Sequence, residues 1–88
     1  MVGLIRGVDA YQVSLEEGSI GPNTKIIYFD AKGEVTRESY GERGGGFIIA
    51  NMPQGFRTVL IQPSGSSKAL ATAVLVESRV TNVISKSF

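Results

Sequence analysis

Short runs of apolar residues, separated by glycine and proline, recur along the whole chain. The strongest lies at residues 24–30, where four consecutive apolar side chains begin at Ile26. Val and Ile far outnumber Leu, and β-branched side chains suit the pleated surface of a sheet better than a helix. No stretch keeps an apolar helical spacing for three turns without one of the eleven glycines or three prolines. The pattern therefore predicts an all-β chain.

Seven strands are predicted, at a spacing of about ten residues. They occupy residues 2–8, 24–30, 34–40, 47–51, 56–62, 68–76 and 80–86. We expect 24–30 to be central, with 34–40 as its hairpin partner across a turn at 30–33, and the last two strands to form a second hairpin. Residues 8–17 come closest to helical spacing, so a short helix there is an alternative. This pattern is typical of a seven-stranded, antiparallel Greek-key β-sandwich.

The length and charge of the chain limit the classes of function. Eighty-eight residues make a single domain, 1–88, with one small core. Nine basic residues stand against eight acidic ones, and the basic residues are scattered along the chain. This distribution lacks the clustered positive charge of a nucleic-acid-binding surface. No apolar run approaches the ~20 residues of a membrane span. We therefore expect neither nucleic acid nor a membrane span among its interactions.

The sequence contains neither histidine nor cysteine. It thus lacks the commonest general base, and the commonest zinc ligands. Asp30 and Glu34 flank a turn and are too few oxygen ligands for calcium. The glycine-rich residues 41–46 lack the phosphate-binding pattern GxxxxGK[ST], and a strand pattern follows them instead of a helix. We expect no catalytic residue, no cofactor and no metal site, and therefore no enzyme activity.

Residues 45–61, GGFIIANMPQGFRTVLI, carry a more specific pattern. They resemble the G-x-F-x-h-x-N-h-P-x-G-x-Y-x-h-x-h core (h, apolar) of carboxypeptidase regulatory-like domains, which belong to the transthyretin-like (prealbumin-like) β-sandwiches. Residues 3–8 are similar to the first strand of that family, and residues 73–84 to its last hairpin. The resemblance covers most of the chain, although only the central segment is specific.

The physical roles of the matching residues are clear from their types. Two alternate residues of one strand point to the same face and are expected in the core, and a turn follows in which proline fixes φ and glycine supplies an unusual φ. The asparagine is expected to bond to nearby backbone. The structural core and turn residues are Phe47, Ile49, Asn51, Met52, Pro53 and Gly55. Arg57 stands where the family has an aromatic residue, and a slip by one residue would place Phe56 there, so the register after Gly55 stays open.

The resemblance implies a function as well as a fold. Members of the family mostly act as non-catalytic modules in larger secreted or surface proteins. We therefore expect a structural or protein-interaction module, excised from a larger extracellular, cell-surface or periplasmic protein. Its partners would be neighbouring domains or another protein. A small-ligand or carbohydrate-binding β-sandwich is the alternative, and the sequence does not identify the ligand.

Overall fold

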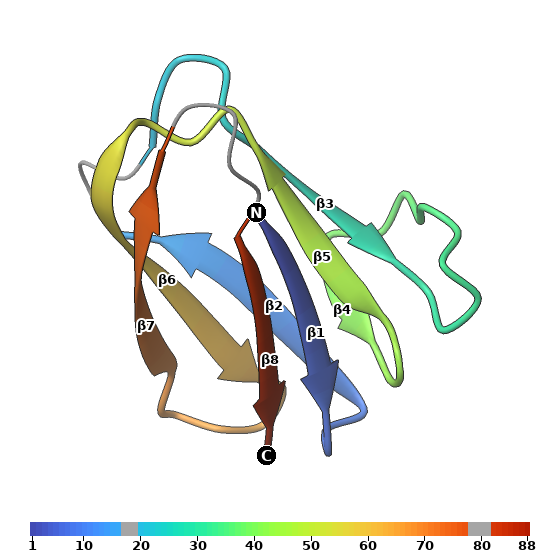
Figure 1. The fold of residues 1–88 in the computed structure, drawn as a ribbon. Coiled ribbons are helices and arrows are strands. Elements are labelled where there is room, and N and C mark those ends of the chain that lie inside the picture. The colour runs from blue at the N-terminus through green and yellow to red at the C-terminus, as the bar shows by residue number, and fades with distance from the viewer. Residues whose placement is uncertain (17–19, 78–81) are drawn as a thin grey trace.

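The chain folds into strands alone in the part that the structure describes. The computed structural model describes residues 1–16, 20–77 and 82–88. Eight strands and no helix occur in these ranges, which confirms the all-β prediction (Figure 1). The strands are β1 (Val2–Arg6), β2 (Ala10–Leu15), β3 (Lys25–Phe29), β4 (Gly41–Glu42), β5 (Gly46–Ala50), β6 (Gly55–Pro63), β7 (Leu70–Val76) and β8 (Val83–Ser87).

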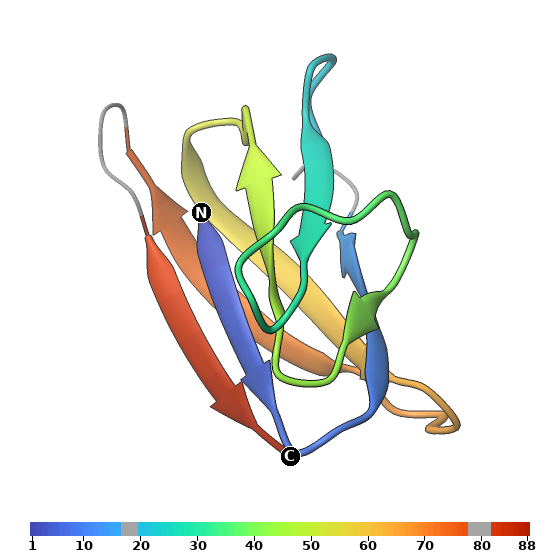
Figure 2. The ribbon, with the colours of Figure 1, turned by 90° about the vertical axis from the view of Figure 1, so that its right-hand side faces the viewer.

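The strands form two four-stranded sheets that pack face to face (Figures 1 and 2). The first, called the β1 sheet, has the order β3-β5-β1-β8, and the second, called the β2 sheet, has the order β4-β2-β6-β7. The predicted sandwich-like arrangement is confirmed, but the strand count is eight, because β2 and the short β4 were not predicted and the strand predicted at 34–40 does not form. The strand at 24–30 was expected to be central, and that expectation is wrong, because β3 lies at one edge of its sheet.

The possible helix at residues 8–17 is a strand over most of its length. Tyr11 and Val13 of β2 are buried, whereas Gln12 and Ser14 are exposed, which is the two-residue alternation of a half-buried strand. Residue 17 lies outside the described residues. The apparent helical spacing arose because the apolar positions at 8, 11 and 15 span a strand and its flanks.

The hairpin predicted after the strongest strand is mostly absent. The turn itself forms. The Asp30 carboxylate accepts hydrogen bonds from the backbone amides of Lys32 and Glu34, and Gly33 has a φ of 82°. Beyond it only Val35 bridges to β3, and the chain then crosses to the β2 sheet to form β4. Residues 37–40 are polar or exposed, so they offer little apolar area that a full strand would bury.

The predicted last hairpin is also wrong. β7 pairs with β6 in one sheet, while β8 pairs with β1 in the other, and the β1–β8 pair is parallel. The fold is therefore not wholly antiparallel. Residues 78–81, which include most of the predicted turn, lie outside the described residues. Separating the two segments lets β7 contribute Val74 to one side of the core and β8 contribute Ile84 to the other.

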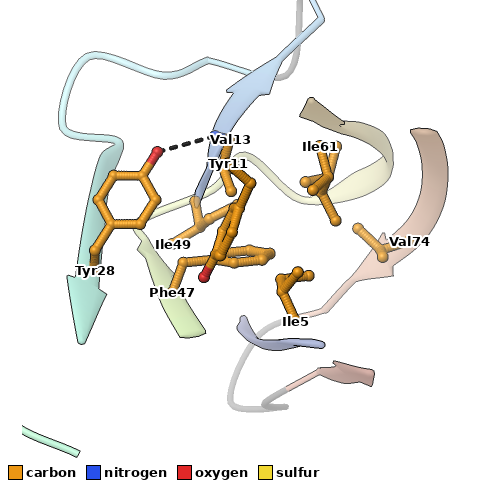
Figure 3. Close-up of a cluster of buried hydrophobic side chains, with 9 residues drawn as sticks. Ile5, Tyr11, Val13, Tyr28, Phe47, Ile49, Ile61 and Val74 are labelled. Carbon is orange, nitrogen blue, oxygen red and sulfur yellow. Dashed lines mark hydrogen bonds between the residues drawn. The ribbon is translucent and has the colours of Figure 1, made fainter. Parts of the chain in front are cut away.

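Two aromatic rings meet at the centre of the core, one from each sheet (Figure 3). Tyr11 lies opposite Gly41 in the β2 sheet, and Phe47 lies opposite Gly3 in the β1 sheet. A Cβ atom at either glycine would overlap the ring across from it. The rings contact edge to face, with centroids 6.4 Å apart. The buried core comprises Ile5, Tyr11, Val13, Tyr28, Phe47, Ile49, Val59, Ile61 and Val74.

Candidate interaction surface

The residues of the sequence motif lie on β5 and on the turn that follows it. Phe47 and Ile49 face inward and are almost completely buried. Asn51 adopts a left-handed conformation with a φ of 59°, which asparagine tolerates better than most residues. Its side-chain amide donates to the Asn23 carbonyl at 3.2 Å, and its own carbonyl accepts the Thr24 hydroxyl at 2.8 Å. These bonds tie the end of β5 to the start of β3.

The rest of the turn carries the chain from the β1 sheet to the β2 sheet. Met52 packs against the core, and Gly55 has a φ of 107°, which a side chain would rarely adopt. The Arg57 guanidinium donates to the carbonyl of Pro53 at 3.0 Å and also to that of Gln54. Of the six motif residues, Phe47 and Ile49 thus fill the core, and Asn51, Met52, Pro53 and Gly55 lie on the connection between the two sheets.

The register after Gly55 is settled by burial. Val59 and Ile61 of β6 are fully buried, and alternation places Arg57 in the same inward phase, at the end of the strand. Phe56 points the opposite way and is 79% exposed. The guanidinium of Arg57 satisfies turn carbonyls at the position where the resembling family carries an aromatic ring.

The outer face of the β1 sheet carries a continuous apolar row. Strand register aligns one residue from each of its four strands across the sheet, and Val83 at the end of the row is 66% exposed. We call this the outer row, and it consists of Ile27, Ile48, Val2 and Val83. The adjacent row holds Phe29 and Leu4, with Gly46 between them. Sequence reasoning missed this surface, although apolar residues at both odd and even positions of residues 26–29 signal it.

The charged residues within the strands of the β1 sheet are all basic. Arg6 and Lys25 stand on the outer face at opposite ends of the sheet, and the strands of the β1 sheet contain no acidic residue. The opposite outer face, on the β2 sheet, is different. There Phe56 lies beside Leu75, and the outward residues of β2, Gln12 and Ser14, are uncharged and lie opposite Gln62 and Leu60.

Two hollows lie at other places in the fold. One, of about 320 Å³, opens between β2 and β3 and is mainly apolar; it is lined by Val13, Ser14, Leu15, Ile20, Thr24 and Ile26. The other is polar, and Arg43 and Asp9 form an exposed ion pair at 3.4 Å on its wall. No motif residue lines either hollow.

Among the described residues, two tyrosines have pKa values that the fold shifts. Burial, with a smaller effect of Tyr28, raises the pKa of Tyr11 from 10.0 to about 12. Burial also raises the pKa of Tyr28, and a hydrogen bond from the Val13 amide at 2.9 Å opposes that shift. The Tyr11 hydroxyl is buried, and it has no hydrogen-bond partner among the described residues. Figure 3 shows both hydroxyls, with that of Tyr28 bonded to the backbone of Val13, a residue that also lines the hollow between β2 and β3.

Within residues 1–16, 20–77 and 82–88, no three His, Cys, Asp or Glu side chains gather as a metal site would require. The same ranges hold no helix that is long and apolar enough to cross a membrane. Neither a family model, nor a curated protein, nor a solved structure matches the chain. The family resemblance of residues 45–61 therefore rests on their sequence pattern alone.

Proposed function

We propose that this domain is a non-catalytic structural or protein-interaction module of a larger exported or cell-surface protein, and that it docks through the outer face of the β1 sheet. The observation that carries the proposal is the outer row. Its four aligned side chains form a contiguous apolar strip in which Val83 is exposed and the other three are partly exposed. Contiguous apolar surface marks contact sites in soluble proteins. A neighbouring domain or another protein would cover it.

Charge narrows the chemistry of that partner. Because Arg6 and Lys25 border the outer row and the strands beneath it carry no acidic residue, a complementary partner surface is apolar with acidic residues at its margins. Stacking two copies by this face would bring like charges together. The proposal therefore favours a different protein or domain as the occupant of this face.

The proposal includes the finer fold assignment, a Greek-key, transthyretin-like sandwich of the carboxypeptidase regulatory-like family. The support is local. Phe47 and Ile49 fill the core, and the turn after β5 uses a left-handed Asn51 and a positive φ at Gly55. An extracellular or periplasmic location follows from the same assignment.

Thiol labelling tests the docking face, because a chain without cysteine gives an unambiguous signal from one introduced thiol. The variant Val83→Cys is compared with Gln12→Cys, an exposed position on the other sheet. In the protein as its own gene expresses it, we expect Val83→Cys to react about tenfold more slowly than in the isolated domain, since a partner excludes the reagent. Gln12→Cys should react equally in both. Equal rates at position 83 would contradict the proposal.

The hollow between β2 and β3 favours a second candidate, binding of a small apolar ligand. Its volume of about 320 Å³ falls at the lower end for ligand pockets, and its walls are mostly aliphatic. Octanol is a suitable probe, and it should raise the melting temperature of the natural chain by mass action. The variant Leu15→Phe fills the hollow and should remove that rise. A melting temperature that octanol leaves unchanged would exclude this candidate.

A further inference from the structure

Each sheet has two edge strands, and three of these four edges carry a feature that discourages pairing. The β3 edge is covered by residues 34–36, where the Thr36 amide donates to the Tyr28 carbonyl at 2.9 Å. β4 has only two residues, and β8 carries Lys86 on its inward phase. Short strands, covering segments and inward charges are the usual means of protecting an edge.

The fourth edge, β7, is neither short nor charged, and among the described residues no backbone other than that of β6 bonds to it. Its seven residues, LATAVLV, include no charge, no proline and no glycine. β7 pairs with β6 on one side and is the last strand of the β2 sheet on the other. A long, uncharged edge strand is a template for a further strand.

On its free side, β7 directs backbone amides and carbonyls away from β6, where a further strand could bond to them. The Leu75 carbonyl accepts the Asn82 side-chain amide at 2.8 Å, so it faces away from β6. Because hydrogen-bonding direction alternates along an antiparallel strand, the amides and carbonyls of Ala73 and Ala71 face the same way. A carbonyl has two lone pairs, and the Leu75 oxygen can therefore accept a second donor beside Asn82.

We propose that β7 pairs antiparallel with β7 of a second copy of this chain, about a two-fold axis through Ala73, so that the two β2 sheets become one continuous eight-stranded sheet. An axis at Ala73 aligns the whole of Leu70–Val76 with its counterpart, because those two ends are equally distant from it. This edge is distinct from the docking face of the β1 sheet, and either interaction can fail without the other.

Side-chain sizes fit this register. Ala73 faces Ala73 of the second copy, and Leu75 faces Ala71 of the second copy, so each large side chain meets a small one. Phe56 lies beside Leu75 on the same outer face, and Leu60 lies beside Ala71. Pairing therefore joins Phe56 and Leu75 of one copy to Ala71 and Leu60 of the other in one apolar row. Cross-strand apolar neighbours of this kind stabilise a sheet.

Charge also favours a second copy at this edge. The outward residues of β6 and β7 that approach the axis, such as Thr58 and Ala73, are uncharged. Two copies thus meet without like-charge repulsion, in contrast to the outer face of the β1 sheet with its basic margins.

Charge complementation at position 73 tests both the dimer and its register. Sedimentation of the natural chain over a range of concentrations should show reversible dimer formation. Ala73→Lys and Ala73→Glu should each weaken the dimer on the order of tenfold or more, since two like charges then stand directly opposite. An equimolar mixture of the two variants should regain the association. Gln12→Lys, an exposed substitution on the same outer face but away from the edge, should leave it unchanged.

Circular dichroism spectra of the variants should match that of the natural chain, because position 73 is exposed. A natural chain that stays monomeric at millimolar concentration would overturn the dimer. A dimer that neither charge weakens would show that β7 is not the contact, and a mixture that stays monomeric would overturn the axis at Ala73. If the thiol at position 83 reacts slowly but the chain stays strictly monomeric, the docking proposal stands and only the β7 dimer is contradicted.

Discussion

Each sheet places one aromatic ring in the core, over a glycine of the neighbouring strand, but only one of the two rings carries a hydroxyl group. In the β1 sheet Phe47 lies over Gly3, and in the β2 sheet Tyr11 lies over Gly41. Phe47 carries no polar group, whereas the Tyr11 hydroxyl is buried without a partner among the described residues. The ring of Tyr28 contacts that of Tyr11, with centroids 6.1 Å apart. Its hydroxyl accepts a hydrogen bond from the Val13 backbone amide.

This comparison indicates that shape holds the central rings in place. A glycine across the strand pair leaves room for a ring, and the opposite sheet closes over it. The hydroxyl of Tyr11 adds burial cost without a compensating bond, while that of Tyr28 satisfies a backbone donor. The following predictions test this view, from the largest expected effect to the smallest.

Removing the central ring of the β1 sheet should have the largest effect. Phe47 is 0% exposed, and Phe47→Ala should lower the free energy of unfolding by about 3–5 kcal/mol, through lost burial and a cavity. Phe56→Ala is the matched control, because Phe56 is 79% exposed, and it should cost less than about 1 kcal/mol. Urea unfolding followed by circular dichroism measures both. Equal urea midpoints for the two variants would mean that the core is misplaced.

Filling the space under each ring should destabilise the fold to a different degree in the two sheets. Gly3→Ala and Gly41→Ala both force a methyl group against a ring, and overpacking costs about 1–3 kcal/mol. We expect Gly3→Ala to cost more, because β1 is held between β5 and β8, whereas β4 is a two-residue edge strand that can shift. The urea midpoint reports the order of the two variants. A more damaging Gly41→Ala would contradict the argument from strand position.

Removing the hydrogen-bonded hydroxyl of Tyr28 should cost no more than the overpacking variants. Tyr28→Phe leaves the buried Val13 amide without its acceptor, and an unsatisfied buried donor costs about 1–3 kcal/mol. Thermal unfolding at neutral pH measures the loss. A melting temperature equal to that of the natural chain would show that the amide finds another acceptor.

Removing the unpartnered hydroxyl should have the smallest effect at neutral pH. Tyr11→Phe deletes no hydrogen bond seen in the described residues, so stability should change by less than about 0.5 kcal/mol or increase.

Alkaline pH should reveal the difference that neutral pH hides. The folded state raises the pKa of Tyr11 from 10.0 to about 12, so the folded chain holds this proton more tightly than the unfolded chain. Its contribution is complete below pH 10 and is lost as the pH rises from about 10 to 12. Tyr11→Phe should therefore reduce the loss of stability at alkaline pH. Part of that loss will remain in the variant, because the pKa of Tyr28 is also raised. An unchanged alkaline profile would contradict the burial of this hydroxyl.

Local chemistry was readable from the sequence where the backbone itself demands it. The burial of Phe47 and Ile49 follows from their alternate positions, and the positive φ of Gly55 follows from a turn that a side chain would strain. The sequence also shows directly that the chain has no histidine or cysteine side chain to act as a general base or a zinc ligand. The outer row was missed because a run of consecutive apolar residues reads as a strand buried on both faces, and only strand order shows that one face is open.

The sequence by itself determined that this chain forms short β-strands joined by glycine turns, because β-branched residues, alternation and positive-φ positions act over a few neighbours. Only the tertiary structure decided which strands pair. It placed β7 and β8 in different sheets, set β8 parallel to β1, and left 34–40 without a strand partner beyond Val35. Pairing depends on closing one small core from two sides, and alternation fixes which residues face inward but not which strand lies alongside.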